Sequence, residues 1–577
     1  MHLKWTNELF NKANIMEKYF ENLPLLLKSS AEKYGDNMAL AIARGISYSY
    51  KELCQLSLWV AEKLYGAGVQ KGDTIAIIGE NTPHWTASYF GIQKAGGIVV
   101  PILTDFSGNE MLSILEHSGA TVVFVSSIQA KKLIKGLPKS VKYLVSLEDL
   151  KMMEVSELKS IQENAAPAIE KITPSEVSEK INYPELFKDD LAVIIYTSGT
   201  TGRSKGVMLS HDNLIFDAVQ TGTIHQVIES DVFISVLPLA HTYESTIGMI
   251  IPLLNGASVY YIDRAPTASY LGPLLQEIRP TTMLTVPLII EKIYKSKIKP
   301  GIQASPVTRI MAKIGFTRKI VHKAAGKKLK EFFGGRMRFF GVGGAPLAPE
   351  VEKFLLEAKF PYAIGYGLTE TAPMLAGFGP SSPVYRSVGV VMEGVDIKIM
   401  NPDPHTGEGE IIAKGRNIMH GYYKNDEITK EVFTDDGYFM TGDLGLLDKN
   451  GILYIKGRSK NMILGANGEN IYPEEIESVI NEQEYVNESL VLQIKGKLVA
   501  KVHLNIELLE EKFKHALNSA QDKQAELNKK VDELLLELQV HVNHRMNKNS
   551  RLQLVIFQAE PFEKTPTLKI KRFLYSD

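Results

Sequence analysis

A glycine- and hydroxyl-rich segment, YTSGTTGRSKGV (Tyr196–Val207), is the part of the sequence best suited to holding an anion. It follows Leu191–Ile195, an apolar run typical of a buried strand. Glycines let backbone N–H groups approach a phosphate, hydroxyls add donors, and Lys205 adds a mobile positive charge. The segment is not a Walker A loop, because Ser204 stands where that motif needs its second glycine. A polar surface turn is the weaker interpretation.

This segment resembles the phosphate-binding loop of the adenylate-forming superfamily of acyl-CoA synthetases, luciferases and peptide-synthetase adenylation domains. The superfamily's usual proline before the loop lysine is Ser204 here. The resemblance continues along nearly the whole chain through motifs in the superfamily's order, which is far more specific than any single motif. It implies that these residues bind the nucleotide: Thr197, Ser198, Gly199, Thr200, Thr201, Gly202 and Lys205.

The segment FFGVGGAPL, Phe339–Leu347, is similar to the superfamily's adenine-side loop. Small residues after a strand let a flat base pack against the backbone, and the implied contacts are Gly344, Ala345 and Pro346. Alone this motif is weak, because many strand-to-helix turns share the composition.

The segment GYGLTETA, Gly365–Ala372, is a stronger match. The resemblance implies that Tyr366 stacks on adenine beside Gly367. It also implies that Thr369 contacts the α-phosphate and that Glu370 binds magnesium. These roles suit an aromatic face, a hydroxyl donor and a hard oxygen ligand. A lone Thr-Glu pair would more often begin a helix.

Two further motifs, YFMTGD ending at Asp443 and GRSK ending at Lys460, match the superfamily's ribose-binding strand and domain junction. By resemblance, Asp443 accepts hydrogen bonds from the ribose hydroxyls and Arg458 makes a second ribose or phosphate contact. Lys460 would be the hinge, and Asn461 stands where an acid is common. A turn cap and a surface ion pair are the plain alternatives for Asp443 and Arg458.

The C-terminal region contains two more matches. The segment GANGENIYPEEIE resembles the loop that meets the active site during thioester formation, with Gly468 on the coenzyme A path. The segment KTPTLKIKR resembles the motif whose lysine, here Lys569, bridges carboxylate and ATP during adenylation. Leu568 stands where glycine is common, and Lys564 and Lys571 are neighbouring candidates. Without the resemblance, these would be a glycine-rich turn and a solvated basic tail.

The substrate clues are two segments, Leu237–Ser245 and Thr285–Tyr294, that resemble the long-chain fatty acyl-CoA synthetase branch. His241 matches the residue flanking the carboxylate pocket, although a lone histidine can equally be a core residue or a surface donor. Leu288 stands where that branch usually has arginine. No residue matches a fixed partner for an amino group, which disfavours an amino-acid substrate.

Helical and strand patterns alternate from about residue 25 to 400, which predicts an α/β fold with mainly parallel sheets flanked by helices. Shorter strands and turn-rich pieces then predict a small β-rich subdomain over about 389–457. The clearest strands expected in the first region are Thr74–Ile78, Ile98–Pro101, Thr121–Val125, Ala192–Tyr196 and Met283–Val286.

We expect a large N-terminal domain, residues 1–457, and a small mobile α+β domain, residues 458–577, with the hinge at 458–460. Residues 508–546 are strongly helical with one apolar stripe. A helical hairpin packed on the C-terminal domain is preferred to a coiled-coil partner site.

Composition limits the function classes. A chain of 577 residues is too long for a single hydrophobic core, so more than one domain is expected. Lys+Arg number 65 and Asp+Glu number 66, so the chain lacks the basic excess of a nucleic-acid-binding protein. The single cysteine, Cys54, excludes an intrachain disulfide and suits a reducing, cytoplasmic compartment. The apolar run Ile247–Ile262, interrupted by Pro252, falls short of the roughly 20 residues of a membrane span. Peripheral membrane contact and oligomeric state stay open.

The resemblance implies two steps. A fatty carboxylate attacks the α-phosphate of MgATP and expels pyrophosphate, and the thiol of coenzyme A then attacks the acyl-adenylate and releases AMP. Two alternatives remain: transfer of the acyl group to an acyl-carrier protein, and a non-catalytic lipid or nucleotide sensor.

Overall fold

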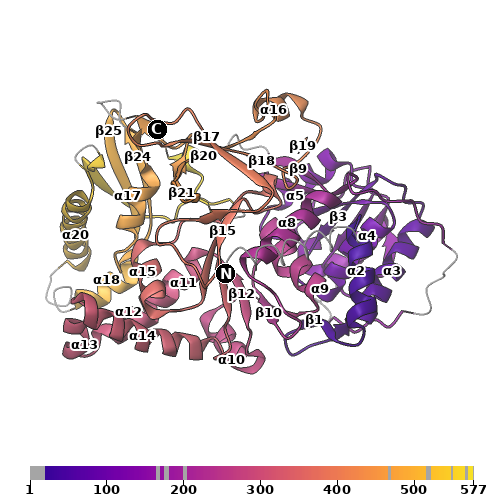
Figure 1. Cartoon of the computed structure of the whole chain (residues 1–577), viewed down its shortest axis with the longest axis horizontal. Helices are drawn as coiled ribbons and strands as arrows, with labels where there is room; N and C mark the ends of the chain where they lie inside the picture. The colour runs from indigo at the N-terminus through magenta and orange to yellow at the C-terminus, as the bar shows by residue number, and fades with distance from the viewer. Residues whose placement is uncertain are drawn as a thin grey trace.

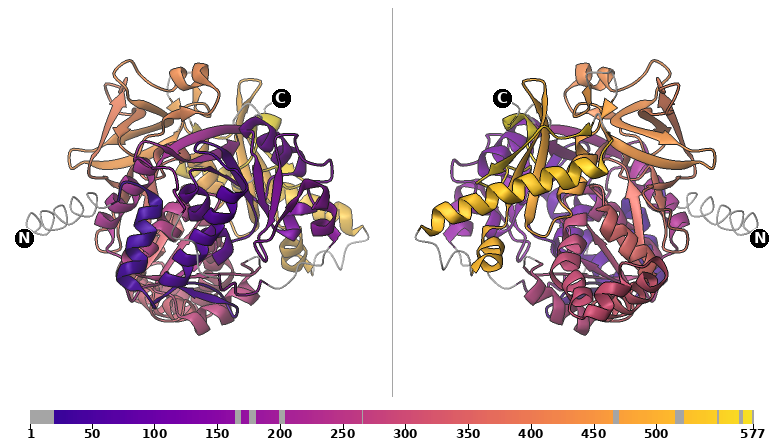
Figure 2. Two further views of the ribbon diagram at one scale, coloured as in Figure 1. Left: turned by 90° about the vertical axis from the view of Figure 1, so that its right-hand side faces the viewer. Right: turned by 90° about the vertical axis from the view of Figure 1, so that its left-hand side faces the viewer.

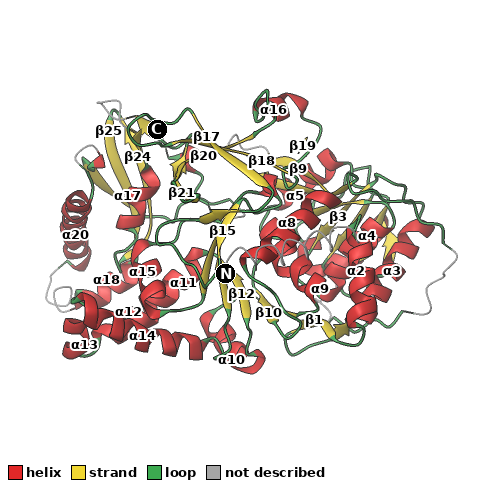
Figure 3. Ribbon diagram, viewed as in Figure 1, coloured by secondary structure: helices red, strands yellow, loops and turns green. Residues whose placement is uncertain are grey.

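The structure, a computed structural model, describes residues 20–163, 169–174, 181–198, 204–264, 266–464, 470–514, 522–547, 550–565 and 569–575. Within these ranges the chain forms two large sheets with flanking helices and, beyond Arg458, a smaller sheet with its own helices (Figures 1 and 3). The predicted α/β fold class is therefore confirmed.

One large sheet has the strand order β19-β9-β8-β4-β3-β5-β6-β7. Its central strands are parallel, and every residue of three of them is buried, which explains their continuous apolar sequences. The strands are β3 (Thr74–Ile78), β4 (Ile98–Ile102), β5 (Val122–Val125), β6 (Tyr143–Ser146), β7 (Met152–Glu154), β8 (Leu191–Ser198), β9 (Ser204–Ser210) and β19 (Gly421–Tyr422).

The other large sheet has the order β17-β18-β20-β21-β16-β15-β14-β13-β12-β10-β11-β1-β2. It is parallel from β1 to β14 and antiparallel from β14 to β17, so the β-rich region expected over 389–457 continues this sheet. The strands are β1 (Met38–Ile42), β2 (Ser47–Ser49), β10 (Val232–Ser235), β11 (Ser258–Tyr261), β12 (Thr282–Thr285), β13 (Phe339–Val342), β14 (Tyr362–Tyr366), β15 (Ala376–Phe378), β16 (Gly389–Val391), β17 (Val395–Met400), β18 (Gly409–Gly415), β20 (Phe439–Leu447) and β21 (Ile452–Arg458).

Helices connect these strands and begin where capping side chains allow. Ser49 and Glu52 form a reciprocal capping box at the start of α3, as Ser107 and Glu110 do for α5. The helices and helical turns are α2 (Leu23–Tyr34), α3 (Tyr50–Gly66), α4 (Pro83–Lys94), α5 (Gly108–Ser118), α6 (Ser127–Ala130), η1 (Val155–Glu157), α7 (Leu158–Glu163), α8 (His211–Ile224), η2 (Tyr243–Ile250), α9 (Ile251–Asn255), α10 (Ala268–Ile278), α11 (Pro287–Ile293), η3 (Tyr294–Ile298), α12 (Lys299–Gln303), α13 (Pro306–Met311), α14 (Gly315–Phe332), α15 (Pro349–Ala358), η4 (Thr369–Thr371) and α16 (Asp426–Glu431).

The apolar run at 247–262 forms the end of η2, the short helix α9 and strand β11, as its interruptions predicted. Among the described residues, no helix is long and apolar enough to cross a membrane.

The C-terminal part is built on a three-stranded sheet in the order β24-β25-β26. The predicted apolar stripe of α20 is buried against this sheet, which confirms its packing within the C-terminal part (Figure 2). The elements are β22 (Ile463–Leu464), β23 (Asn470–Ile471), α17 (Pro473–Ile480), β24 (Val486–Ile494), β25 (Lys497–Leu504), α18 (Ile506–Lys512), α20 (Lys523–Arg545), β26 (Leu554–Gln558) and η6 (Arg572–Leu574).

The two parts meet through polar contacts. The Tyr472 hydroxyl donates to Glu408 Oε2 at 2.8 Å, and Lys456 Nζ lies 4.0 Å from Glu475 Oε1. Within the C-terminal part itself, Asn461 Nδ2 donates to Glu474 Oε1 at 2.7 Å, and Asn461 stands where an acid is common in the superfamily. Contacts of this kind can be broken by a domain movement at small cost, and the hinge at Lys460 remains a prediction.

Candidate active site

The predicted nucleotide-binding residues lie where parallel strands end. The loop Gly344–Pro346 follows β13 and is exposed, and Tyr366 is the last residue of β14. Gly344 has φ +84°, a left-handed conformation that favours glycine. Thr197 and the backbone of Ser198 end β8 in the other large sheet. Carboxyl ends of parallel strands are the usual position of ligand sites in α/β proteins.

Gly367 lies where any side chain would collide with the backbone. A Cβ atom there would lie 1.7 Å from the Pro373 carbonyl oxygen, so the GYGLTETA segment folds back closely on itself. Two buried side chains support this fold: Asp217 Oδ1 accepts from the Met374 N–H at 2.9 Å, and Asn417 Nδ2 donates to the Thr371 and Met374 carbonyls at 3.0 and 2.6 Å. Asp217 and Asn417 belong to no sequence motif, and the sequence analysis missed both.

Gly367→Ala should destabilise the fold by about 1–3 kcal/mol, because the added methyl group must displace backbone. Urea unfolding measures this change. Gly222→Ala is the matched control, since a Cβ at this helical position meets nothing within 4 Å and alanine favours a helix. Equal stability of Gly367→Ala and the unmodified protein would contradict the prediction.

Asp443 is the centre of a buried polar cluster. The Tyr366 hydroxyl donates to Asp443 Oδ2 at 2.8 Å, and Arg458 Nε lies 2.8 Å from Asp443 Oδ1. Asp443 and Arg458 are register partners on β20 and β21. Burial raises the pKa of Asp443, and the Arg458 charge opposes that rise. A carboxylate with both oxygens directed by neighbours is suited to accept paired hydroxyl donors.

Glu370 has a partner that the sequence analysis missed. The Tyr422 hydroxyl donates to Glu370 Oε1 at 2.9 Å, and Lys205 Nζ lies 4.9 Å from the centre of the Tyr422 ring. Pairing of β19 with β9, in which Tyr422 opposes Val207, brings these side chains together. Tyr422 lies in none of the recognised motifs, so no sequence signal marked it.

The metal ligands available around Glu370 suit a cation that binds together with the phosphates of a nucleotide. Among the described residues, no group of three or more His, Cys, Asp or Glu side chains could hold a metal ion alone. Mg²⁺ commonly uses one or two carboxylates together with phosphate oxygens and waters. One carboxylate, beside Thr369 at the start of η4, fits that requirement.

Lys569 reaches this site from the C-terminal part of the chain. Its side chain keeps exposed surface, yet partial burial, followed by the Arg458 charge, lowers its pKa, while the charges of Asp443 and Glu370 raise it. Lys564, a neighbouring candidate, instead pairs with Glu488 at 2.5 Å. Lys569 is thus the lysine of this motif that acts electrostatically on the predicted nucleotide residues.

His241 lies close enough to Lys569 for the Lys569 charge to act on its ring. Its Nδ1 accepts a hydrogen bond from the Tyr243 N–H at 3.1 Å, so the neutral ring carries its proton on Nε2. Burial, followed by the Lys569 charge, lowers the pKa of His241 to about 4. At neutral pH it is therefore an uncharged donor.

Part of the predicted site falls outside the described residues: Gly199, Thr200, Thr201, Gly202 and Gly468. Lys460 follows β21 in a turn.

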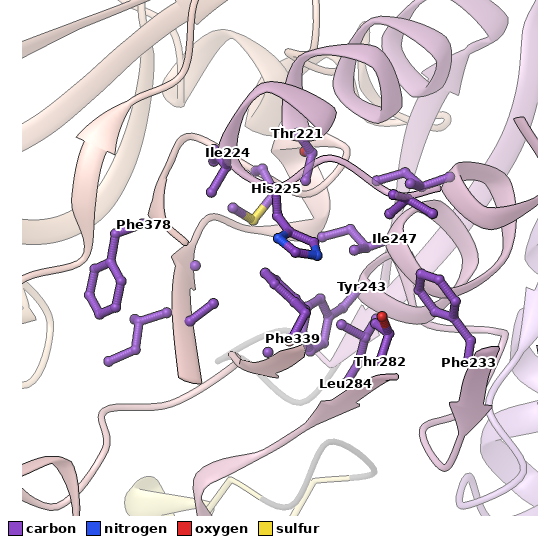
Figure 4. A pocket seen from close by; sticks show the side chains of 17 residues that line it. Thr221, Ile224, His225, Phe233, Tyr243, Ile247, Thr282, Leu284, Phe339 and Phe378 are labelled. Atoms are coloured by element: carbon purple, nitrogen blue, oxygen red, sulfur yellow. The ribbon is translucent and has the colours of Figure 1, made fainter. Parts of the chain in front are cut away.

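An apolar pocket adjoins the site between η2, α8 and the large sheet (Figure 4). Gly341 and Gly365 line the end nearest the predicted nucleotide loops, and Phe339 lies deeper, at the start of β13. His225 stacks on Phe339 with ring centres 4.6 Å apart. The cavity volume is only ≈ 40 Å³, so side chains, among them Tyr243, nearly fill the pocket.

The fold and the site together define an adenylate-forming enzyme: strand-end loops for a nucleotide, a lysine from the C-terminal part that acts on the site, and an apolar pocket. The chain belongs to the AMP-binding enzyme family, whose model matches residues 27–423.

Known proteins agree with this class. Long chain acyl-CoA synthetase 1 of Arabidopsis thaliana is 30% identical over 530 residues, covering 84% of this chain and 79% of that protein. A long-chain-fatty-acid–CoA ligase of Xenopus laevis, ACSBG2, is 28% identical over 491 residues, 79% of this chain and 66% of its own length. The chain thus spans about two thirds of that relative. These relatives confirm the resemblance to the long-chain acyl-CoA synthetase branch.

The fold has solved counterparts. The ATP-bound structure of MatB from Rhodopseudomonas palustris superimposes with a TM-score of 0.71 at 24% identity, covering 95% of this chain and 97% of that one. This similarity confirms the fold.

Proposed function

We propose that the protein is an AMP-forming fatty acyl-CoA synthetase that joins a long-chain fatty acid to coenzyme A at the expense of ATP. The observation that carries this proposal is the meeting of Lys569 with Asp443, Glu370 and His241 beside an apolar pocket. The long-chain fatty acids named for the relatives supply the substrate class.

In the first step, the fatty carboxylate enters past His241 and attacks the α-phosphate, the bond to the β-phosphate oxygen breaks, and pyrophosphate leaves. Neutral His241 offers its Nε2–H to the carboxylate without a competing charge. Lys569 and Lys205 neutralise charge that develops on the phosphates, which is the principal way such sites accelerate reactions. Glu370 would hold Mg²⁺, which neutralises phosphate charge when bound.

Ribose binding follows from the Asp443 cluster. Asp443 would accept hydrogen bonds from the ribose hydroxyls, with Arg458 holding its carboxylate in place. Tyr366 would offer its ring face to adenine while its hydroxyl stays near Asp443.

In the second step, the thiol of coenzyme A attacks the acyl-adenylate and AMP leaves. Gly468 and Lys569 lie in the same C-terminal part yet serve different steps, and a packed domain cannot present two surfaces to one acyl group. We therefore infer that residues 458–577 rotate about Lys460 between the steps.

A pyrophosphate-release assay with ATP, Mg²⁺ and a panel of carboxylic acids tests the proposal, with coenzyme A and carrier protein compared as acceptors. Release with long fatty acids and thioester formation on coenzyme A are expected. Thioester formation only on carrier protein would favour the alternative acceptor, and no release with any acid would favour a sensor. The cytoplasmic location proposed here suits a chain with a single cysteine, Cys54, which can form no intrachain disulfide.

Affinity should climb with acyl chain length until the pocket is full, because each buried methylene contributes roughly 0.8 kcal/mol. The acyl chain must first displace side chains, since the cavity is small. His225→Ala removes one ring of the deep stack and should move the optimum toward longer acids. KM values for acids of increasing length measure both effects.

His405→Ala is the control for that series, because this exposed histidine lies in a turn between β17 and β18. Preference for acetate or benzoate over palmitate would refute the apolar acyl pocket.

A further inference from the structure

A strongly basic stretch connects β12 to β13. Residues 292–330 contain ten lysines and two arginines and no aspartate or glutamate, in a chain whose net charge is −1. The proposed reaction steps assign no role to this stretch. It forms α11 to α14 at one end of the molecule (Figure 1).

Large apolar side chains are exposed within the same stretch. Phe316 is 78% exposed, Val307 64% and Ile310 62%, and Ile314 and Ile320 are also exposed. These five side chains, the apolar tip, lie on α13, the following turn and the first turns of α14. A cluster of this size on a protein surface indicates an interaction site.

The geometry of α14 combines both features on one face. Phe316, Ile320, Lys323 and Lys327 recur at intervals of four, three and four residues, which is one side of a helix. The opposite side of α14 packs against the protein interior through buried apolar residues. Gly326 allows a close approach there, since a Cβ at this position would lie 2.6 Å from Ala358 Cβ.

Most of the positive charge on this surface is available. Lys299 and Arg318 pair with Glu350 and Glu357 of α15. On α13, α14 and the turn between them, the exposed basic residues that make no ion pair with a described residue are Arg309, Lys313, Lys319, Lys323, Lys327, Lys328 and Lys330.

We propose that α13 and α14 dock the protein on an anionic lipid surface. The apolar tip enters the boundary between headgroups and acyl chains, and the surrounding lysines face anionic headgroups. Exposed phenylalanine and isoleucine beside lysine fit a lipid boundary, whereas a nucleic acid would use the charge alone. Along the chain, the docking surface connects β12 to β13, two strands that line the apolar pocket.

Sedimentation of the full chain with vesicles tests this proposal. Vesicles of phosphatidylcholine with added phosphatidylglycerol should retain the protein at low salt, and phosphatidylcholine alone should retain far less. Ile310→Ser with Phe316→Ser should weaken binding at least tenfold, because two apolar side chains no longer enter the lipid boundary. Separately, Lys319→Glu with Lys323→Glu should also weaken binding at least tenfold, since one lysine near an anionic surface changes binding by about fivefold.

Leu536→Ser with Val540→Ser is the matched control, because these side chains are 64% and 70% exposed on α20, outside the docking surface. This control should bind as the unmodified protein does. Circular dichroism and pyrophosphate release with a water-soluble acid should be unchanged in all three variants, which separates docking from catalysis.

Equal retention by neutral and anionic vesicles, or equal loss in the control and the docking variants, would overturn the proposal. Binding to duplex RNA without binding to vesicles would overturn it as well.

Discussion

Lys569→Ala should reduce acyl-adenylate formation by about a hundredfold to a thousandfold, the usual loss when one electrostatic group at a transition state is removed. Formation of the thioester from supplied acyl-adenylate should stay largely intact. The reason is the position of Lys569: its charge interacts with Asp443, Glu370 and His241, which belong to the adenylation site. Single-turnover assays of each half-reaction measure the separation.

Lys571→Ala is the control for this experiment, because it removes a lysine two residues away in the same motif. It should leave both half-reactions nearly unchanged. If Lys569→Ala impairs both half-reactions equally, either the assignment of Lys569 or the domain rotation is wrong.

Lys460→Pro should produce the opposite pattern. Proline fixes φ near roughly −65°, so the turn after β21 loses the freedom that a rotation requires. Adenylation should continue in the arrangement seen here, and thioester formation should fall. Unchanged turnover of the complete reaction would show that Lys460 is not the hinge.

Glu370→Ala is expected to have the second large effect. Removing the carboxylate should greatly reduce adenylation, because Mg²⁺ would lose its protein ligand. Raising the Mg²⁺ concentration should restore activity only in part. Initial rates of pyrophosphate release across a magnesium titration measure the change.

Tyr422→Phe is the matched control for Glu370. It removes the hydroxyl that donates to Glu370 at 2.9 Å and keeps the ring beneath Lys205. The acceptor is a carboxylate, and a hydrogen bond to a charged group contributes about 1.5–3 kcal/mol, so the loss should be about tenfold to a hundredfold. Unchanged turnover of Glu370→Ala at limiting Mg²⁺ would remove Glu370 from the metal site.

Local sequence patterns determined the elements and the candidate motifs. Thr74–Ile78 was predicted to the residue, and the apolar stripe of α20 was recognised from helical spacing alone. The motifs around Tyr366 and Asp443 are contiguous, so residue type and short spacing carry their chemistry without knowledge of the fold.

Only the tertiary structure decided which distant residues meet. Tyr422 reaches Glu370 through strand pairing, and Lys569 rather than Lys564 faces the nucleotide residues because Glu488 holds Lys564. Hydrophobic periodicity specifies which face of an element is buried, but it does not specify the partner against which that face packs. The β-rich region therefore looked separate in sequence, whereas backbone hydrogen bonds between β15, β16 and β21 join it to the large sheet.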